Sequence, residues 1–318
     1  MKNVSSDEPL RRVISRRKAL RGIGIALAAA PFAKLLGCSS DGASGTADGT
    51  DASAGGDTGL AADATAAGEA GAWATGGTAS MNGDYPDPFA SGLGTTCALT
   101  CAATLGPCYA ATVVRKDISE GHDGLPVRLA FLVVDEKCTP IPNASIDIWH
   151  CAPEGLYSGD DASDFCTSGD ATARAARWFR GVQTTDATGR ADFDTCFPGW
   201  YSSRTIHIHF TIRINNAEYV TSQLVFDDAL DDEIVSTQPL YNTRGARDTN
   251  NTNDNVVGGA AISDYTFQTS RMSDGAMLAW KALVIRSSTT ADLCSIGGGG
   301  GGPPPDGGPG GPRPDGGP

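Results

Sequence analysis

The sequence PGWYSSRTIHIHF, residues 198–210, holds two of the four histidines of this 318-residue chain. His207 and His209 lie two positions apart in a run rich in β-branched residues, which predicts a β-strand. Alternate side chains of a strand point to the same face, so both imidazoles share one face, while Ile208 and Phe210 point to the opposite, core-facing side. Two imidazoles held by one strand form half of a metal site.

The residue types that complete this site decide which metal it would bind. Tyr201 directly precedes the strand, and a second tyrosine, Tyr157, follows shortly after the turn-forming sequence APEG. A phenol ionises near pKa 10, so it becomes a ligand only when a strongly Lewis-acidic ion displaces its proton. Two phenolates and two imidazoles therefore favour Fe(III), whereas cysteine or carboxylate ligands would indicate zinc or ferrous iron.

Six segments of the chain resemble, in the same order, segments of the intradiol ring-cleavage dioxygenases, especially the secreted members of that family. The last of the six is residues 198–210, and together they cover roughly residues 97–230. The other five are LGPCY at 105–109, RKDI at 115–118, ASIDIWH at 144–150, GLYS at 155–158 and RGVQTTD at 180–186. A His-x-His pair alone is a weak signal, but six segments in the family's order are a strong one.

The resemblance implies a reaction and a set of site residues. In that reaction O2 cleaves a catechol-type ring between its two hydroxylated carbons and gives a cis,cis-muconate-type product. The residues that correspond to the family's Fe(III) ligands are Tyr157, Tyr201, His207 and His209. Arg204 corresponds to the active-site arginine and Gln223 to the active-site glutamine. Tyr201 would leave the metal when substrate binds and help to take a substrate proton.

The chain also departs from the family pattern. Cys108 stands where the family usually has an aromatic residue after Gly-Pro, which suggests that a pocket wall is exchanged for a disulfide. Only five residues separate Tyr201 from His207, which indicates a trimmed loop and a more open site. The helical N-terminal region by which the intracellular catechol enzymes dimerise has no counterpart here. Substrate preference and oligomeric state are therefore left open.

Turn signals recur at short intervals between residues 85 and 295 and separate runs of strand-forming residues. The region is long enough for one domain with a substantial core. We predict an all-β fold, an antiparallel β-sandwich with few short helices, which agrees with the fold that the resemblance implies. Trp149 is expected to face the sandwich interior, and His150 to be a structural or solvent-facing histidine rather than a fifth ligand. The expected strands are Val127–Asp135, Ala144–His150, Arg190–Asp194, Thr205–Ile214 and Glu218–Phe226.

Residues 1–37 have the features of an export signal. The sequence SRRKAL at 15–20 resembles a twin-arginine motif, and LLGC at 35–38 resembles a lipobox. The apolar run between them, residues 22–32, is too short to span a membrane. We expect cleavage before Cys38 and acylation of that cysteine, which would attach the protein to a membrane of the cell envelope. An ordinary secretory signal is the alternative.

Amino-acid composition indicates that the remaining segments are flexible, and the net charge argues against one class of partner. Residues 38–84 and 296–318 contain few large apolar side chains and are predicted to be a flexible linker and a disordered Gly/Pro-rich tail. Removing residues 1–37, with eight Lys/Arg and two Asp/Glu, changes the formal net charge from −13 to −19. Such an acidic protein is not expected to bind nucleic acid.

Eight cysteines follow Cys38, and an even number in an exported protein predicts disulfides. We favour a Cys138–Cys151 pair because these residues flank one predicted strand and its approach, and we leave the other pairings open. A cysteine metal cluster is disfavoured because the usual Cys-x-x-Cys spacing does not occur.

Two other classes of function compete with the dioxygenase. A non-catalytic β-sandwich module of the cell envelope would keep the fold and bind a carbohydrate, a protein or a metal. A zinc hydrolase would need a carboxylate or cysteine ligand, for which no spacing is evident.

Overall fold

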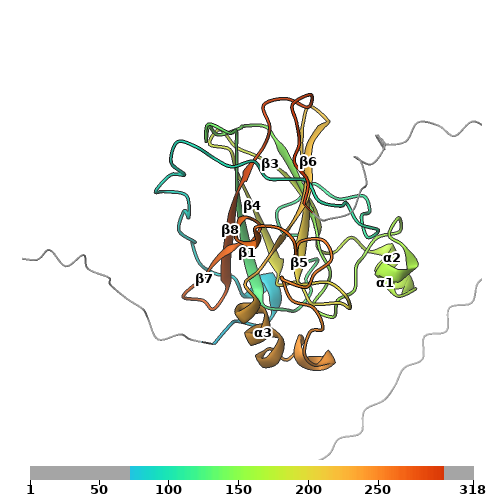
Figure 1. Ribbon diagram of the computed structural model, residues 1–318. Helices are drawn as coiled ribbons and strands as arrows, with labels where there is room; N and C mark the ends of the chain where they lie inside the picture. Colours follow the sequence, from blue (N-terminus) through green and yellow to red (C-terminus); the bar gives the residue numbers. More distant parts are fainter. Residues whose placement is uncertain (1–71, 297–318) are drawn as a thin grey trace, which may run out of the picture. The chain divides into compact units, whose positions relative to one another are not determined.

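The computed structural model describes residues 72–296, and all of them belong to one compact unit, Ala64–Pro318. The strands of this part of the chain form two four-stranded sheets (Figure 1). Sheet I has the order β4-β1-β8-β7 and sheet II the order β3-β2-β5-β6. The predicted export signal, Cys38, most of the predicted linker and nearly all of the predicted tail lie outside the described residues.

Sheet I is built around a strongly apolar central strand. Its members are β1 (Pro126–Val134), β4 (Arg190–Cys196), β7 (Gln268–Arg271) and β8 (Met277–Val284). Strand β1 pairs antiparallel with β4 and parallel with β8, so that Val127 lies opposite Met277. The sheet is therefore mixed, with one parallel pair in a sandwich whose other strand pairs are antiparallel as predicted.

Sheet II carries the histidine strand and is antiparallel in every pair. Its members are β2 (Ser145–Trp149), β3 (Arg180–Thr184), β5 (His207–Ile214) and β6 (Ala217–Val225). Strands β5 and β6 are joined by Asn215 and Asn216, whose φ angles are 50° and 65°. Positive φ at both central residues defines a type I′ hairpin, and asparagine is one of the few residues that adopts it readily.

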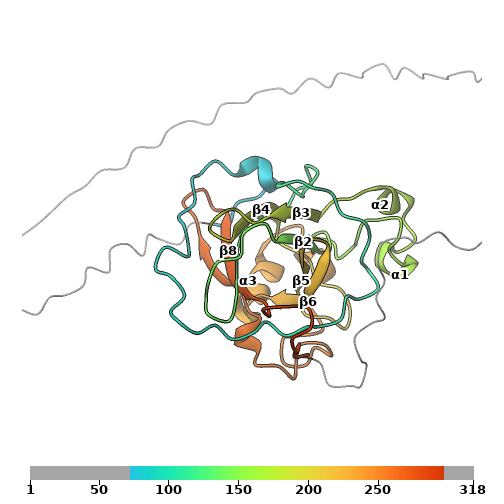
Figure 2. The same cartoon turned by 90° about the horizontal axis from the view of Figure 1, so that it is seen from above.

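The main hydrophobic core lies between the two sheets, and it confirms the predicted β-sandwich (Figure 2). Every second residue of the facing strands contributes a buried side chain, as the period of two in a strand requires. On β1 these are Val127, Leu129, Phe131 and Val133, and on β5 they are Ile208, Phe210 and Ile212. Because the isoleucines of β5 point into this core, its two histidines point to the outer face of sheet II.

Helices are short and few in the described part of the chain. They are α1 (Asp164–Thr167), α2 (Ala171–Ala175) and α3 (Asp228–Thr237), with 3-10 turns η1 (Gly77–Ser80), η2 (Asn242–Arg244) and η3 (Ile262–Asp264). In both Figure 1 and Figure 2, α1 and α2 lie beside sheet II, on the side away from sheet I. Between residues 72 and 296, no helix has the length and apolar character needed to cross a membrane.

Part of the segment predicted to be a linker, which was expected to end at residue 84, packs against the sandwich. Trp73 is only 9% exposed and packs into the main core. Its Nε1 donates a hydrogen bond to Glu233 at 2.8 Å, and the guanidinium of Arg271 stacks 3.9 Å from the centre of its ring. One aromatic anchor at the end of an apolar-poor segment thus fixes residues that composition alone assigned to the linker.

The disulfides differ from the pair that we favoured from the sequence. The described residues contain the bonds Cys97–Cys138, Cys101–Cys294 and Cys108–Cys166. The predicted Cys138–Cys151 pair is wrong, because Cys151 follows β2 in sheet II and donates its S–H to the carbonyl of Gly199 at 3.1 Å. The predicted participation of Cys108 in a disulfide is confirmed.

Candidate active site

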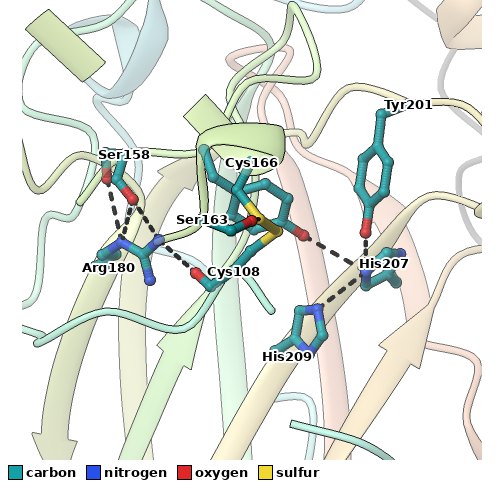
Figure 3. The surroundings of a disulfide bond; sticks show 9 residues. Cys108, Ser158, Ser163, Cys166, Arg180, Tyr201, His207 and His209 are labelled. Atoms are coloured by element: carbon teal, nitrogen blue, oxygen red, sulfur yellow. Dashed lines mark hydrogen bonds between the residues drawn. A yellow bond between two sulfur atoms is a disulfide. The ribbon is translucent and has the colours of Figure 1, made fainter. Parts of the chain in front are cut away.

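Four side chains named from the sequence converge around one atom, Nε2 of His207. This nitrogen lies 3.1 Å from Nε2 of His209, 3.1 Å from the hydroxyl of Tyr201 and 3.5 Å from the hydroxyl of Tyr157. Figure 3 shows Tyr201, His207 and His209 pointing toward one another. Ligand atoms about 2 Å from a common ion lie about 2.8–3.5 Å from each other at ordinary coordination angles. The three separations measured from Nε2 of His207 therefore fit donors to one bound ion.

Different elements position these four side chains. His207 and His209 project from the outer face of β5, Tyr201 lies in the turn before that strand, and Tyr157 lies between β2 and α1. Tyr157 is 1% exposed and each histidine 2%, so three of the four donors are shielded from water. Tyr201 is only partly buried, which makes it the donor nearest to solvent.

Trp149 forms one wall of the site rather than part of the core between the sheets. Its ring stacks on His209 with centroids 4.9 Å apart and an interplanar angle of 10°. The prediction that Trp149 faces the sandwich interior is wrong, because Ile148 faces that core and the next residue of a strand must face the other way. The indole therefore fixes the orientation of the His209 ring.

The segment at 105–109 covers the other side of His209. Gly106 has φ +75°, and a Cβ atom there would lie only 3.2 Å from Cε1 of His209. The Cys108–Cys166 disulfide ties this segment to α1, and the carbonyl of Cys166 accepts a hydrogen bond from the backbone N–H of Tyr157 at 2.9 Å. In Figure 3 the disulfide lies between the histidines and Arg180. The disulfide and this hydrogen bond together connect the segment that covers His209 to the backbone of Tyr157.

Both imidazoles are held neutral. Burial, followed by the nearby charge of Arg204, lowers the pKa of His207 to about 3. Burial and the adjacent His207 hold the pKa of His209 well below its usual value. Nδ1 of His207 donates to the carbonyl of Thr205 at 2.7 Å, which leaves the Nε2 lone pair facing the other donors. A neutral imidazole with a fixed lone pair is the form that binds a metal.

Both phenols need a strong cation to ionise. Burial raises the pKa of Tyr201 to about 12, and burial together with Tyr201 raises the pKa of Tyr157 well above its usual value. Over residues 72–296, no group of three or more His, Cys, Asp or Glu side chains is arranged to hold a metal ion. The candidate centre is thus a mixed set of phenols and imidazoles, and such donors suit a hard, highly charged ion such as Fe(III).

Arg204 and Gln223, both predicted to act in catalysis, contact each other beside this centre. Gln223 lies on β6 directly opposite His209, and its Oε1 accepts a hydrogen bond from Nη2 of Arg204. Its Nε2 donates to the carbonyl of Thr104 at 2.9 Å. The positive charge of Arg204 lowers the pKa of Tyr201 and so opposes part of the rise that burial causes.

Other candidate residues have structural partners. His150 is 1% exposed and donates from Nδ1 to the carbonyl of Cys151 at 2.8 Å, as expected of a structural histidine. The hydroxyl of Tyr109 donates to Asp147 at 3.1 Å. Sequence reasoning missed Arg180, which is fully buried and donates from Nη2 to the carbonyl of Cys108 at 2.7 Å. It also missed Asp254, which accepts a hydrogen bond from Nε of Arg204 at 2.9 Å.

The two-sheet fold and the four converging side chains agree with a ring-cleaving dioxygenase, and comparison with known proteins shows the family. The family model described as Dioxygenase matches residues 105–271, and the chain belongs to the intradiol ring-cleavage dioxygenase family. It is similar to the structure of the intradiol ring-cleavage dioxygenase from Tetranychus urticae, with 27% sequence identity and a TM-score of 0.54. That match covers 62% of this chain and 99% of the other.

A second solved structure also matches. It is the dioxygenase domain of a fusion of a dioxygenase and a carbohydrate-binding protein from the cellulolytic bacterium Streptomyces sp. SirexAA-E. Sequence identity is 20%, the TM-score is 0.42, and the match covers 60% of this chain and 100% of the other. No curated protein sequence matches the chain.

Proposed function

We propose that this protein is an Fe(III)-dependent intradiol dioxygenase that cleaves a catechol-type ring with O2 to a cis,cis-muconate-type product. The observation that carries the proposal is the placement of two phenol oxygens and one imidazole nitrogen within 3.5 Å of Nε2 of His207. Fe(III) bound there would supply the Lewis-acidic centre at which a catecholate becomes reactive toward O2. Tyr157, Tyr201, His207 and His209 would hold it.

The four donors would have different roles during turnover. Tyr157, His207 and His209 are shielded from water and would hold the ion throughout. Tyr201 is partly exposed and lies in a turn, so it can move with the least disruption of packing. Its phenolate oxygen, once released from the ion, would then take a proton from a substrate hydroxyl and become a neutral phenol. The guanidinium of Arg204 would stabilise the negative charge that develops on the substrate, as a preorganised cation does in a dry site.

The test is oxygen uptake by the purified, Fe(III)-loaded protein with a panel of catechols, followed by mass spectrometry of the product. We expect a product that has gained both atoms of O2 and is cleaved between the hydroxylated carbons. We also expect visible absorption from phenolate-to-iron charge transfer, weakened in Tyr201→Phe. The control is Tyr241→Phe, which removes a more deeply buried tyrosine hydroxyl that donates to the carbonyl of Phe197 and is not one of the four donors. Colourless, iron-replete protein would overturn the proposal.

We also propose that the protein works outside the cytoplasm, attached to a membrane through acylated Cys38. Three disulfides within residues 72–296 support an oxidising compartment. The twin-arginine-like and lipobox-like sequences support the route and the anchor. Cys38→Ala should move the protein from the membrane fraction to the soluble fraction, and an unchanged distribution would contradict the anchor.

A further inference from the structure

The segment from Asp248 to Asp254 hydrogen-bonds to residues 202–205, which lie between the two candidate ligands Tyr201 and His207. Asp248 accepts hydrogen bonds from the hydroxyl of Ser202 at 2.7 Å and from the backbone N–H of Ser203 at 3.0 Å. Further along, Asn251 accepts a hydrogen bond from the hydroxyl of Thr205 at 2.7 Å. The conformation of residues 202–205 is therefore stabilised by a part of the chain that lies more than forty residues away in sequence.

Asp254 is the buried end of this segment, and only a carboxylate satisfies its surroundings. Its side chain is fully buried. One oxygen, Oδ2, accepts from Nε of Arg204 and from the backbone N–H of Thr205, both at 2.9 Å. The other, Oδ1, accepts from the backbone N–H groups of Val256 at 2.8 Å and Val257 at 3.0 Å. All four partners donate, so an amide in this place would set its own NH2 group against two donors.

Two partners fix the guanidinium of Arg204. Asp254 holds its Nε, and Gln223 holds its Nη2. The hydrogen bonds of Arg204 within the described residues come from Nε and Nη2 and leave Nη1 unused, and the side chain is 12% exposed. A planar guanidinium bound at two of its nitrogens has a fixed orientation, so the direction of the third nitrogen is set before any ligand arrives.

We propose that Asp254 is a positioning residue of the dioxygenase site. It orients Arg204 so that Nη1 is free to donate to the negative charge that develops on the substrate. Its own charge balances the guanidinium, which would otherwise stand uncompensated near a ferric centre. The inference rests on the proposed function, because it assigns the role of Arg204 to that reaction.

A purely structural ion pair is the competing explanation, and the chain offers a matched control for it. Asp231 is also fully buried, and its carboxylate lies 3.3 Å from Nη1 of Arg247. Within the described residues no hydrogen bond or ion pair joins Asp231 to Arg204 or to the four candidate ligands, although Nη1 of Arg247 also reaches the hydroxyl of Thr205 at 3.5 Å. Removing one partner of a buried ion pair destabilises a protein wherever the pair lies. Asp231→Asn and Asp254→Asn should therefore both lower the melting temperature of the metal-free protein.

The two variants should differ in catalysis. We expect Asp254→Asn to lower kcat at least about tenfold, with Fe(III) content and anaerobic catechol binding within about twofold of the unmodified protein, because a misaligned transition-state donor costs rate more than affinity. Asp231→Asn should leave kcat unchanged at temperatures well below its melting temperature. In an Arg204→Gln background, Asp254→Asn should reduce kcat no further. An equal loss of kcat in both backgrounds would overturn the inference, as would an unchanged kcat in the single variant.

Arg204→Lys decides the question if Asp254→Asn does not fold. Lysine keeps the charge next to Asp254 but cannot also present an oriented second donor. We expect Arg204→Lys to lose as much kcat as Arg204→Gln, and retention of most activity would overturn the inference. Absence of turnover in the unmodified Fe(III)-loaded protein would instead refute the proposed function, so the two failures are distinguishable.

Discussion

Removing the Cys108–Cys166 disulfide should both destabilise the protein and weaken metal binding. The change is the pair of substitutions Cys108→Ala and Cys166→Ala. Both cysteines are 3% exposed and pack in the cluster that contains Tyr157. Since the carbonyl of Cys166 accepts from the backbone N–H of Tyr157, freeing α1 loosens the position of that candidate ligand.

The magnitude follows from the length of the loop that each disulfide closes. Cys108–Cys166 spans 58 residues, for which the loss of chain-entropy stabilisation is about 4.2 kcal/mol. Cys97–Cys138 spans 41 residues, for which the loss is about 3.9 kcal/mol. The two removals should therefore lower the free energy of unfolding almost equally. Only the first affects the hydrogen bond to Tyr157, and loss of one such bond, about 1 kcal/mol, corresponds to about fivefold weaker Fe(III) binding.

The assay compares the two double variants side by side. Urea denaturation gives the free energy of unfolding, and titration of the metal-free protein with chelated Fe(III) gives the affinity. We expect similar unfolding free energies and a difference of about fivefold in affinity. Equal effects of both disulfides on Fe(III) binding would refute the local role of Cys108–Cys166 and leave it a general clamp on the fold.

Three further outcomes are expected. Trp73→Ala should lower the free energy of unfolding by about 3–5 kcal/mol in urea denaturation, since it empties a site in the main core, and an effect below about 1 kcal/mol would contradict that packing. Burial lowers the pKa of His150 to about 4, so the unfolded chain binds more protons between pH 6.5 and 4 and stability must fall as pH falls through that window. The loss reaches about 3 kcal/mol at the acid end, and His150→Gln should show a smaller loss over the same window. Chelation of Fe(III) should lower the melting temperature, and adding Fe(III) back should restore it.

Features that depend on local periodicity were predictable from the sequence. The alternation of isoleucine and histidine in β5 fixed which side chains face the core, and Asn215-Asn216 marked the hairpin that follows. Consecutive residues of a strand point to opposite faces, so Trp149 cannot share the core-facing side of β2 with Ile148. The predicted interior position of the indole overlooked this alternation. The four converging donors were also named in advance, because their segments match a family pattern.

Features that depend on distant contacts were not predictable. Cys138 lies 41 residues from its partner Cys97, and nothing in either local sequence marks the pair. Asp254 lies in a run of Asn, Asp and Thr that has the composition of an ordinary surface loop, yet its side chain is fully buried against Arg204. Trp73 is a single aromatic residue at the end of a low-complexity segment. In each case the position of the side chain depends on a residue that is distant in the sequence, and a single sequence does not indicate which residue that is.

The parallel pairing of β1 with β8 has a consequence for biosynthesis. Strand β1 ends at Val134 and β8 begins at Met277, so the edge of β1 that pairs with β8 stays unpaired while the 142 residues between the two strands are synthesised. An open hydrophobic edge is a template for intermolecular pairing. Nascent chains arrested before residue 277 should therefore aggregate or recruit chaperones, and productive folding should wait until ribosomes have completed nearly the whole domain.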